Sequence, residues 1–233
     1  MSSEKLNVSV VLLTKNEEHN IDACLGSCSF AKEIIVVDDE STDGTVAKAK
    51  AFGAKVFTRA LAGNWGEQQT FAISKASCEW VFLIDADERV SPLLAQNLAK
   101  TLEQNPKKTF WIQRENHYNS GRKAHGILRP DWVMRLLPRE GARVEGQVHQ
   151  TICSPFPQEK LSGHLIHFPY RNWEAYFRKF DKYTTLSADK YESQGKNCSF
   201  LGDVIFKPLW AFLKVYFIDL GFLDGKIGWT LSV

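Results

Sequence analysis

The sequence lacks several features that would place it in a common class of protein. It has no G-x-G-x-x-G and no G-x-x-x-x-G-K-[ST] motif, which argues against dinucleotide-dependent dehydrogenases and P-loop nucleoside triphosphatases. The apolar run at residues 8–13 is too short for the core of a signal peptide. No uncharged apolar stretch reaches the roughly 18–20 residues that span a bilayer. We therefore expect neither secretion nor a membrane span.

Cysteine is also scarce and is not arranged for metal binding. The five cysteines are scattered, and Cys24 and Cys28, four residues apart, have no second pair or histidine cluster nearby. This pattern does not favour a zinc site, and free thiols are typical of a reducing cytoplasm. We expect a cytoplasmic protein.

The net charge is only +2, but the charged residues are distributed unevenly along the chain. Residues 1–106 hold 10 basic and 15 acidic residues, whereas residues 107–143 hold 9 basic and 3 acidic ones. Residues 171–214 hold 8 basic and 5 acidic residues. A basic middle and tail indicate a phosphate-bearing partner, although a solvated basic face explains them equally well.

Apolar runs alternate with helical periodicity in the first half of the chain. The pattern predicts strands at 8–13, 33–37, 55–58 and 80–84, separated and followed by helices at 20–29, 43–52, 66–77 and 92–104. Looser strand patterns follow at 110–114 and 129–137. This order predicts an α/β fold with a parallel sheet, in which ligands bind at the carboxyl ends of the strands.

The C-terminal part has a different pattern. Residues 173–194 have helical periodicity, and residues 200–233 are strongly apolar but carry charges at Asp203, Lys207 and Lys214. This combination favours a helix lying in a membrane interface. A core helix packed on the sheet is the alternative.

Acidic side chains follow two of the predicted strands. The sequence DADE at residues 85–88 follows the run WVFLI, and two carboxylates so placed can hold Mg²⁺ or Mn²⁺ against substrate phosphates. Asp38 and Asp39 follow the run EIIVV, where a carboxylate can accept from a ribose hydroxyl or a base N–H. A solvated acidic turn and a helix cap are the plainer explanations of these two segments.

The ordered segments resemble family 2 glycosyltransferases. LTKNEEHNI, VVDDESTDGT and FLIDADERV carry the resemblance, and residues 132–136 (WVMRL) with 145–150 (EGQVHQ) are similar to the lipopolysaccharide-core branch. The resemblance covers nearly the whole chain. It implies a GT-A fold, with a mostly parallel central sheet flanked by helices and a helical, membrane-associating C-terminal tail.

The resemblance also implies a domain organisation. Residues 1–170 would form the GT-A catalytic domain, with a nucleotide-binding half at 1–106 and an acceptor half at 107–170. Residues 171–233 would form a helical, basic and aromatic extension.

Roles for single residues follow from the same resemblance. The residues expected to line a uridine pocket are Thr14, Asn16, Glu17, Asp38 and Asp39. Asp85 and Ala86 would face the ribose or the donor sugar, and Asp87 would bind Mg²⁺ or Mn²⁺ together with Asp85. Gln68 and Arg135 would also contact the nucleotide sugar.

The sequence departs from the family pattern at two places. Enzymes of this kind invert the anomeric carbon and need a general base, but Gln150 replaces the usual glutamate and cannot take a proton. Glu145 is the preferred substitute. His149 is a base, a second-sphere partner of the metal, or a loop hydrogen-bonding residue.

At the second departure, Gln69 stands where the branch has a basic residue near the diphosphate. The missing charge would come from Arg135, Arg139, Arg122 or Lys123, and an arginine suits phosphate best.

The predicted function is transfer of a hexose, with glucose favoured, from a UDP-sugar to a heptose of the lipopolysaccharide inner core. The acceptor is lipid-linked, so the protein would lie on the cytoplasmic face of the inner membrane. Two alternatives stay open: a polyprenyl-phosphate glycosyltransferase, and a catalytically impaired scaffold that binds nucleotide sugars or membrane. Nucleic-acid binding is disfavoured because the basic residues are not interleaved with a stacking platform.

Overall fold

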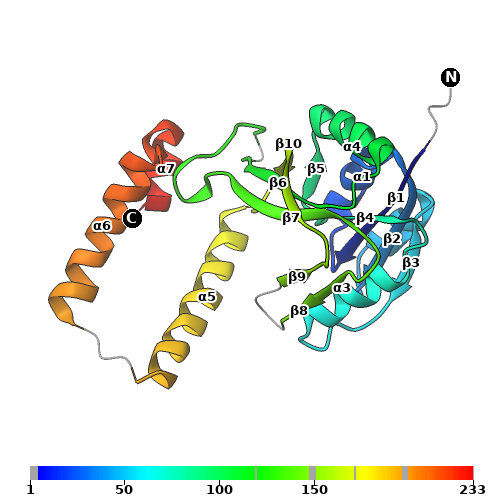
Figure 1. Cartoon of the computed structure of the whole chain (residues 1–233). Helices are drawn as coiled ribbons and strands as arrows, with labels where there is room; N and C mark the ends of the chain where they lie inside the picture. Colours follow the sequence, from blue (N-terminus) through cyan, green and yellow to red (C-terminus); the bar gives the residue numbers. More distant parts are fainter. Residues whose placement is uncertain (1–4, 119, 147–150, 171, 196–198, 233) are drawn as a thin grey trace. The chain divides into compact units, whose positions relative to one another are not determined.

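The computed structural model describes residues 5–118, 120–146, 151–170, 172–195 and 199–232. The chain divides into two units. The sheet unit comprises residues 1–114 and 131–167, and the helical unit comprises residues 115–130 and 168–233. Each unit is described by itself below (Figure 1).

The sheet unit contains the alternation that the sequence predicts. Its elements are β1 (Leu6–Thr14), α1 (Glu18–Ser27), β2 (Ala31–Asp38), α2 (Thr45–Ala51), β3 (Lys55–Thr58), α3 (Trp65–Ser74), β4 (Trp80–Leu83), β5 (Glu88–Val90), α4 (Pro92–Gln104), β6 (Thr109–Asn116), β7 (Asp131–Pro138), β8 (Arg143–Glu145), β9 (Thr151–Cys153) and β10 (Gln158–His167). The predicted strands and helices up to residue 104 are confirmed as β1–β4 and α1–α4. Strands β5, β8, β9 and β10 were not predicted.

Eight strands form one sheet in the order β3-β2-β1-β4-β7-β6-β10-β5. Strands β3, β2, β1 and β4 are parallel neighbours, and β7 joins β4 antiparallel. Strands β1, β2 and β4 are buried on both faces, which explains their apolar runs. A separate hairpin pairs β8 with β9.

Helices cover both faces of the parallel part. On one face, Ile21 of α1 and Leu98 of α4 pack with Phe82 of β4. On the other face, Ile73 of α3 packs with Leu83 of β4. All of these side chains are at most 3% exposed, so the sheet unit has a core on each side of the sheet.

The helical unit contains η1 (Gly126–Leu128), α5 (Trp173–Ser193), η2 (Phe200–Phe206), α6 (Lys207–Leu213), η3 (Lys214–Ile218), η4 (Gly221–Asp224) and α7 (Gly225–Ser232). The predicted helical tail is therefore confirmed. None of the residues of η2, α6 and η3 is buried. The alternative of a core helix packed on the sheet stays untested. Among the described residues, no helix combines the length and the apolarity needed to cross a bilayer.

Candidate active site

The carboxyl ends of the parallel strands bring the predicted residues to one edge of the sheet. Thr14, the last residue of β1, pairs in register with Asp38, the last residue of β2. The Thr14 hydroxyl donates to Asp38 Oδ1 at 3.0 Å, and both residues are buried. Asp85 follows β4 by two residues, at the same end of the sheet, because Leu83 pairs with Val11 of β1.

The loop after β2 is folded around Asp38. Its carboxylate accepts from the Ser41 amide at 2.8 Å and from the Ser41 hydroxyl at 2.5 Å, and Asp38 is only 1% exposed. Asn16 has a positive φ of 56° and accepts from the Thr42 amide at 2.8 Å. These bonds join the loops after β1 and β2 into one rim. Ligand contacts of Asp38 and Asn16 stay predictions.

Two further acids lie on this rim. Asp39 accepts from Lys15 Nζ and from the Leu61 amide, both at 2.8 Å. Burial opposes its charge, but these two donors outweigh burial and lower the pKa of Asp39. Glu17 accepts from Asn20 at 2.9 Å, and burial raises its pKa. The rim therefore holds one firmly ionised carboxylate and one that is easier to protonate.

Gln68 forms two hydrogen bonds with Arg59, a basic residue that the sequence analysis did not identify. Its side-chain amide accepts from Arg59 Nη1 at 2.7 Å and donates to the Arg59 carbonyl at 2.6 Å. The Arg59 amide in turn donates to the Asp38 carbonyl at 2.9 Å, which places Arg59 at the carboxyl end of β2. The available signal was its position directly after the predicted strand at 55–58. Arg59 thus supplies positive charge at the edge where Gln69 lacks it.

The DADE turn is fixed by a buried ionic network. Arg135 Nη2 contacts Asp85 Oδ2 and donates to Glu88 Oε1 at 2.6 Å, and the Glu88 side chain is fully buried. Glu88 Oε2 also accepts from the Asp85 amide at 2.9 Å. The charge of Arg135 outweighs burial and lowers the pKa of Asp85, whereas burial raises that of Glu88. The network presets the position of Asp85.

Asp87 lies beside a histidine from a distant part of the sequence. Strand β10 pairs antiparallel with β5, and His167 is opposite Glu88. This pairing places His167 Nε2 3.2 Å from Asp87 Oδ2. The sequence analysis gave His167 no role. Ala86, between the two aspartates, is buried, and its carbonyl accepts from Arg89 at 2.8 Å.

Asp87 and His167 are the residues that fit a divalent cation. A carboxylate oxygen and an imidazole nitrogen are both ligands that Mn²⁺ accepts, whereas Mg²⁺ prefers oxygen. Among the described residues, no group of three or more His, Cys, Asp or Glu is placed to hold a metal ion. A cation at this pair would therefore need further oxygen ligands from a substrate, as phosphate-bound cations commonly have.

A cleft of about 470 Å³ opens in the sheet unit beside Asp85. The residues that line it are Gln69, Asp85, Trp111, Arg114, Trp132, Val133, Met134, Arg135, Thr151, Ile152 and Gln158. Two polar atoms in its wall, Gln69 Oε1 and Arg135 Nε, are buried without a hydrogen-bond partner in the described structure. Buried polar groups are normally paired, so these atoms mark a place for a polar ligand.

Glu145 lies on the β8–β9 hairpin. Thr70 of α3 accepts from the Val144 amide at 2.9 Å, and the absence of a side chain at Gly66 lets the hairpin approach α3. The Glu145 carboxylate is exposed and accepts from Arg143 at 2.8 Å. On the neighbouring strand, the residue opposite Glu145 is Thr151, which lines the cleft. Its role as base stays a prediction. His149 and Gln150 lie outside the described residues.

The arginines proposed to replace the charge missing at Gln69 lie in different places. Arg135 lines the cleft, and its contact with the donor stays a prediction. Arg139 donates to the Cys78 carbonyl at 3.1 Å, just before β4 begins. It is therefore at the amino end of that strand, and its assignment to the diphosphate is wrong. Arg122 and Lys123 belong to the helical unit, and their roles stay predictions.

Comparison with known proteins decides the family. Residues 9–182 match the sequence profile of Glycosyl transferase family 2. The chain belongs to this family. It is a transferase, and the predicted GT-A fold is confirmed, with its parallel half in β3-β2-β1-β4 and its remaining strands mainly antiparallel.

Two curated relatives cover most of the chain. The lipopolysaccharide core biosynthesis glycosyltransferase LpsC of Rhizobium meliloti is 31% identical over 227 residues, which are 91% of this chain and 82% of the relative. An uncharacterized glycosyltransferase of Rickettsia typhi is 29% identical over 97% of this chain and 82% of its own length.

Solved structures are more distant. Glucosyl-3-phosphoglycerate synthase from Mycobacterium tuberculosis, in complex with Mn²⁺, UDP and its product, has a TM-score of 0.42 at 24% identity. The match covers 58% of this chain and 57% of that one. TarS of S. aureus has a TM-score of 0.41 at 23% identity, over 49% of this chain and 37% of that one. At such TM-scores neither structure carries an argument about function.

Proposed function

We propose that this chain is an inverting, metal-dependent transferase that moves a hexose, with glucose favoured, from a UDP-sugar to a heptose of the lipopolysaccharide inner core. The observation that carries the proposal is its 31% identity, over 91% of the chain, to a lipopolysaccharide core biosynthesis glycosyltransferase. The lipid-linked acceptor implies peripheral contact with the cytoplasmic face of the inner membrane.

The donor would bind at the carboxyl edge of the sheet. The rim formed by Thr14, Asn16, Glu17, Asp38 and Asp39 would take the uridine, with Lys15 and Arg59 as nearby positive charges. Arg135 Nε would donate to an oxygen of the donor in the cleft, next to Asp85. Because Arg135 is held by Glu88, this donor would already be oriented before the substrate binds.

Asp87 and His167 would hold Mg²⁺ or Mn²⁺, whose contribution when bound is to neutralise charge on the leaving diphosphate. Asp85 is less suited to bind the cation directly, because Arg135 already occupies one of its oxygens. We retain Asp85 as a contact to the ribose or the donor sugar.

The general base must take the proton of the acceptor hydroxyl on the side opposite the leaving group. Glu145 is our candidate because its cross-strand neighbour Thr151 lines the cleft. The carboxylate is exposed and can meet an acceptor without rearrangement of the core. Its partner Arg143 donates to the carboxylate at 2.8 Å and would help to orient it.

The test is sugar transfer with a panel of donors. The protein is incubated with UDP- and GDP-sugars, Mn²⁺ or Mg²⁺, and detergent-solubilised core acceptor, beside Asp87→Ala, Glu145→Gln and the matched surface variant Asp22→Ala. Asp22 is exposed and pairs only with Lys48 among the described ion pairs, so its replacement should leave transfer unchanged. We expect metal-dependent transfer from a UDP-sugar that both site variants lose.

Each other outcome separates the alternatives. Transfer lost only in Asp87→Ala would move the base away from Glu145. Transfer only to a polyprenyl phosphate would replace the heptose acceptor. Donor binding without transfer to any acceptor would support the impaired scaffold and contradict the proposed reaction.

A further inference from the structure

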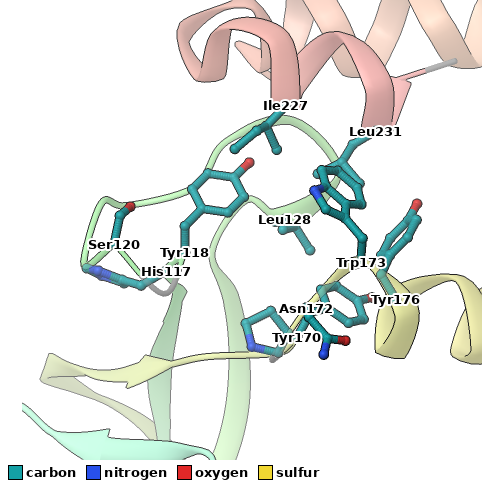
Figure 2. A pocket seen from close by; sticks show the side chains of 11 residues that line it. His117, Tyr118, Ser120, Leu128, Tyr170, Asn172, Trp173, Tyr176, Ile227 and Leu231 are labelled. Carbon is teal, nitrogen blue, oxygen red and sulfur yellow. The ribbon is translucent and has the colours of Figure 1, made fainter.

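The helical unit contains two adjoining hollows that the proposed reaction does not use. The first has a volume of about 320 Å³ and presents the rings of Tyr118, Tyr170, Trp173 and Tyr176 (Figure 2). The second has a volume of about 580 Å³. Residues that line both are Leu128, Tyr170 and Tyr176. Because these three residues line both, the hollows adjoin one another, and we call the two together the aromatic groove.

One stripe of α5 forms a long wall of this groove. Tyr176, Phe180, Thr184, Ala188 and Tyr191 recur at intervals of three and four residues, so they lie on one face of the helix. At 1.5 Å per residue, this stripe is about 22 Å long. One leaflet of a bilayer is about 15 Å deep, half of the hydrocarbon thickness, so the groove is long enough for an acyl chain.

The walls of the groove are mainly apolar. On the opposite side, Figure 2 shows Ile227 and Leu231 of α7 directed toward the rings. The Tyr118 hydroxyl donates to the buried Asp224 at 2.9 Å, so its polar atom is already paired within the protein. Such walls suit a hydrocarbon chain better than a ligand rich in hydroxyl groups.

The surface of the helical unit suits the boundary between water and lipid. Phe200 is 68% exposed and Trp210 is 61% exposed, on a segment without a buried residue. All six tyrosines of the chain belong to this unit. Tyrosine and tryptophan are enriched at the bilayer interface because each side chain has a large apolar surface and a polar group that stays hydrated.

The charges of the helical unit favour an anionic surface. It has 12 basic and 8 acidic residues, a net charge of +4. The Arg122 side chain is 63% exposed while its partner Asp224 is 1% exposed, and Arg129 is 53% exposed while Asp219 is 11% exposed. The cations thus face outward and the acids inward, which attracts anionic headgroups.

We propose that the aromatic groove binds one acyl chain of an anionic bilayer phospholipid, with the apolar face of Phe200–Ile218 among the headgroups. The inference goes beyond the transfer reaction, since none of its residues belongs to the candidate active site. Binding of one chain would anchor the unit by apolar burial, and the outward cations would add electrostatic attraction.

The test blocks the groove and measures retained lipid. The full chain is incubated with vesicles of phosphatidylglycerol and phosphatidylethanolamine and is then separated from unbound lipid. Native mass spectrometry measures the mass of the protein with any phospholipid that it retains. Ala188→Phe places a ring in the groove, and Thr185→Phe places the same ring on α5 at an exposed position that does not line it. We expect one phospholipid on the wild type and on Thr185→Phe. Retention by Ala188→Phe should fall at least about tenfold, the effect of losing burial of two methylene groups.

Three results would overturn the inference: equal retention by Ala188→Phe and Thr185→Phe, no retained lipid on the wild type, or a wild-type dimer that excludes lipid. Circular dichroism and donor binding would establish that Ala188→Phe is folded. Transfer to an acceptor freed of its acyl chains should be equal in wild type and Ala188→Phe. That assay reports on the proposed reaction alone, so the two proposals fail independently.

Discussion

The largest aromatic difference between the two units is between the buried core of one and the exposed C-terminal helices of the other. In the sheet unit, Phe82 is fully buried between strands and helices. In the helical unit, Phe200 and Trp210 are mostly exposed, and two hollows lie against aromatic rings. The sheet unit therefore obtains its stability from its own core, whereas the helical unit presents apolar surface that a soluble monomer rarely leaves uncovered. In our proposals, the sheet unit carries out the chemistry and the helical unit contacts lipid.

The sharpest test of this comparison is one aromatic truncation in each unit. Phe82→Ala should lower the free energy of unfolding by about 3–5 kcal/mol, because it leaves a cavity in a packed core. Trp210→Ala should change it by no more than about 0.5 kcal/mol, because the ring is mostly exposed. Urea unfolding without lipid measures both. Equal losses would show that Trp210 is covered in solution and would break the comparison.

A comparably large effect is expected at the buried ionic network. Glu88→Ala leaves Arg135 in the core with one carboxylate fewer, and should cost about 3–5 kcal/mol of unfolding free energy. Glu159→Ala removes the partner of Lys108 on the surface and should cost about 0–1 kcal/mol. Urea unfolding of both variants measures these two changes in the free energy of unfolding. A small loss for Glu88→Ala would mean that water enters the network.

At the amino ends of the parallel strands, Glu33 has a structural role that depends on pH. It accepts from Lys55 at 2.5 Å and from the Ser77 amide at 2.8 Å. Burial opposes its charge, but these donors and Ser9 lower its pKa from 4.5 to about 2. Since the folded pKa is depressed, the stabilisation, of order 3 kcal/mol, is present above pH 4.5 and lost as pH falls toward about 2.

Glu33→Gln should remove this pH dependence. The difference in unfolding free energy between wild type and variant should be largest near neutral pH and shrink steadily between pH 4.5 and about 2. Urea unfolding across that range measures it. A difference independent of pH would show that hydrogen bonding, and not ionisation, carries the effect.

The smallest expected effect concerns the candidate metal pair. His167→Gln should weaken Mn²⁺ binding in the presence of UDP by about 10–100-fold, because one ligand is lost while the substrate oxygens remain. Isothermal titration calorimetry measures this affinity. His164→Gln, on the same strand and outside the Asp87 contact, is the matched control. Unchanged affinity in His167→Gln would remove His167 from the proposed site.

Much of the sheet unit could be predicted from the sequence. Continuous apolar runs specify strands buried on both faces, and the helices between them require a parallel sheet. Polar residues at the carboxyl ends of such strands must gather at one edge, which is why Thr14 and Asp38 meet. Strand β10 could not be predicted in the same way, because its side chains are only partly buried and its apolar pattern is weak.

The sequence by itself determined the family, the helix–strand alternation and the edge at which the acidic residues collect, because these depend on local periodicity and ordered motifs. Only the tertiary structure decided that His167 lies beside Asp87, that Arg135 holds Asp85 and Glu88, and that Arg139 is at the wrong end of β4. These contacts depend on the order of antiparallel strands, which residues far apart in the chain settle through packing. The aromatic groove is likewise a property of packing, since its rings come from segments more than 50 residues apart.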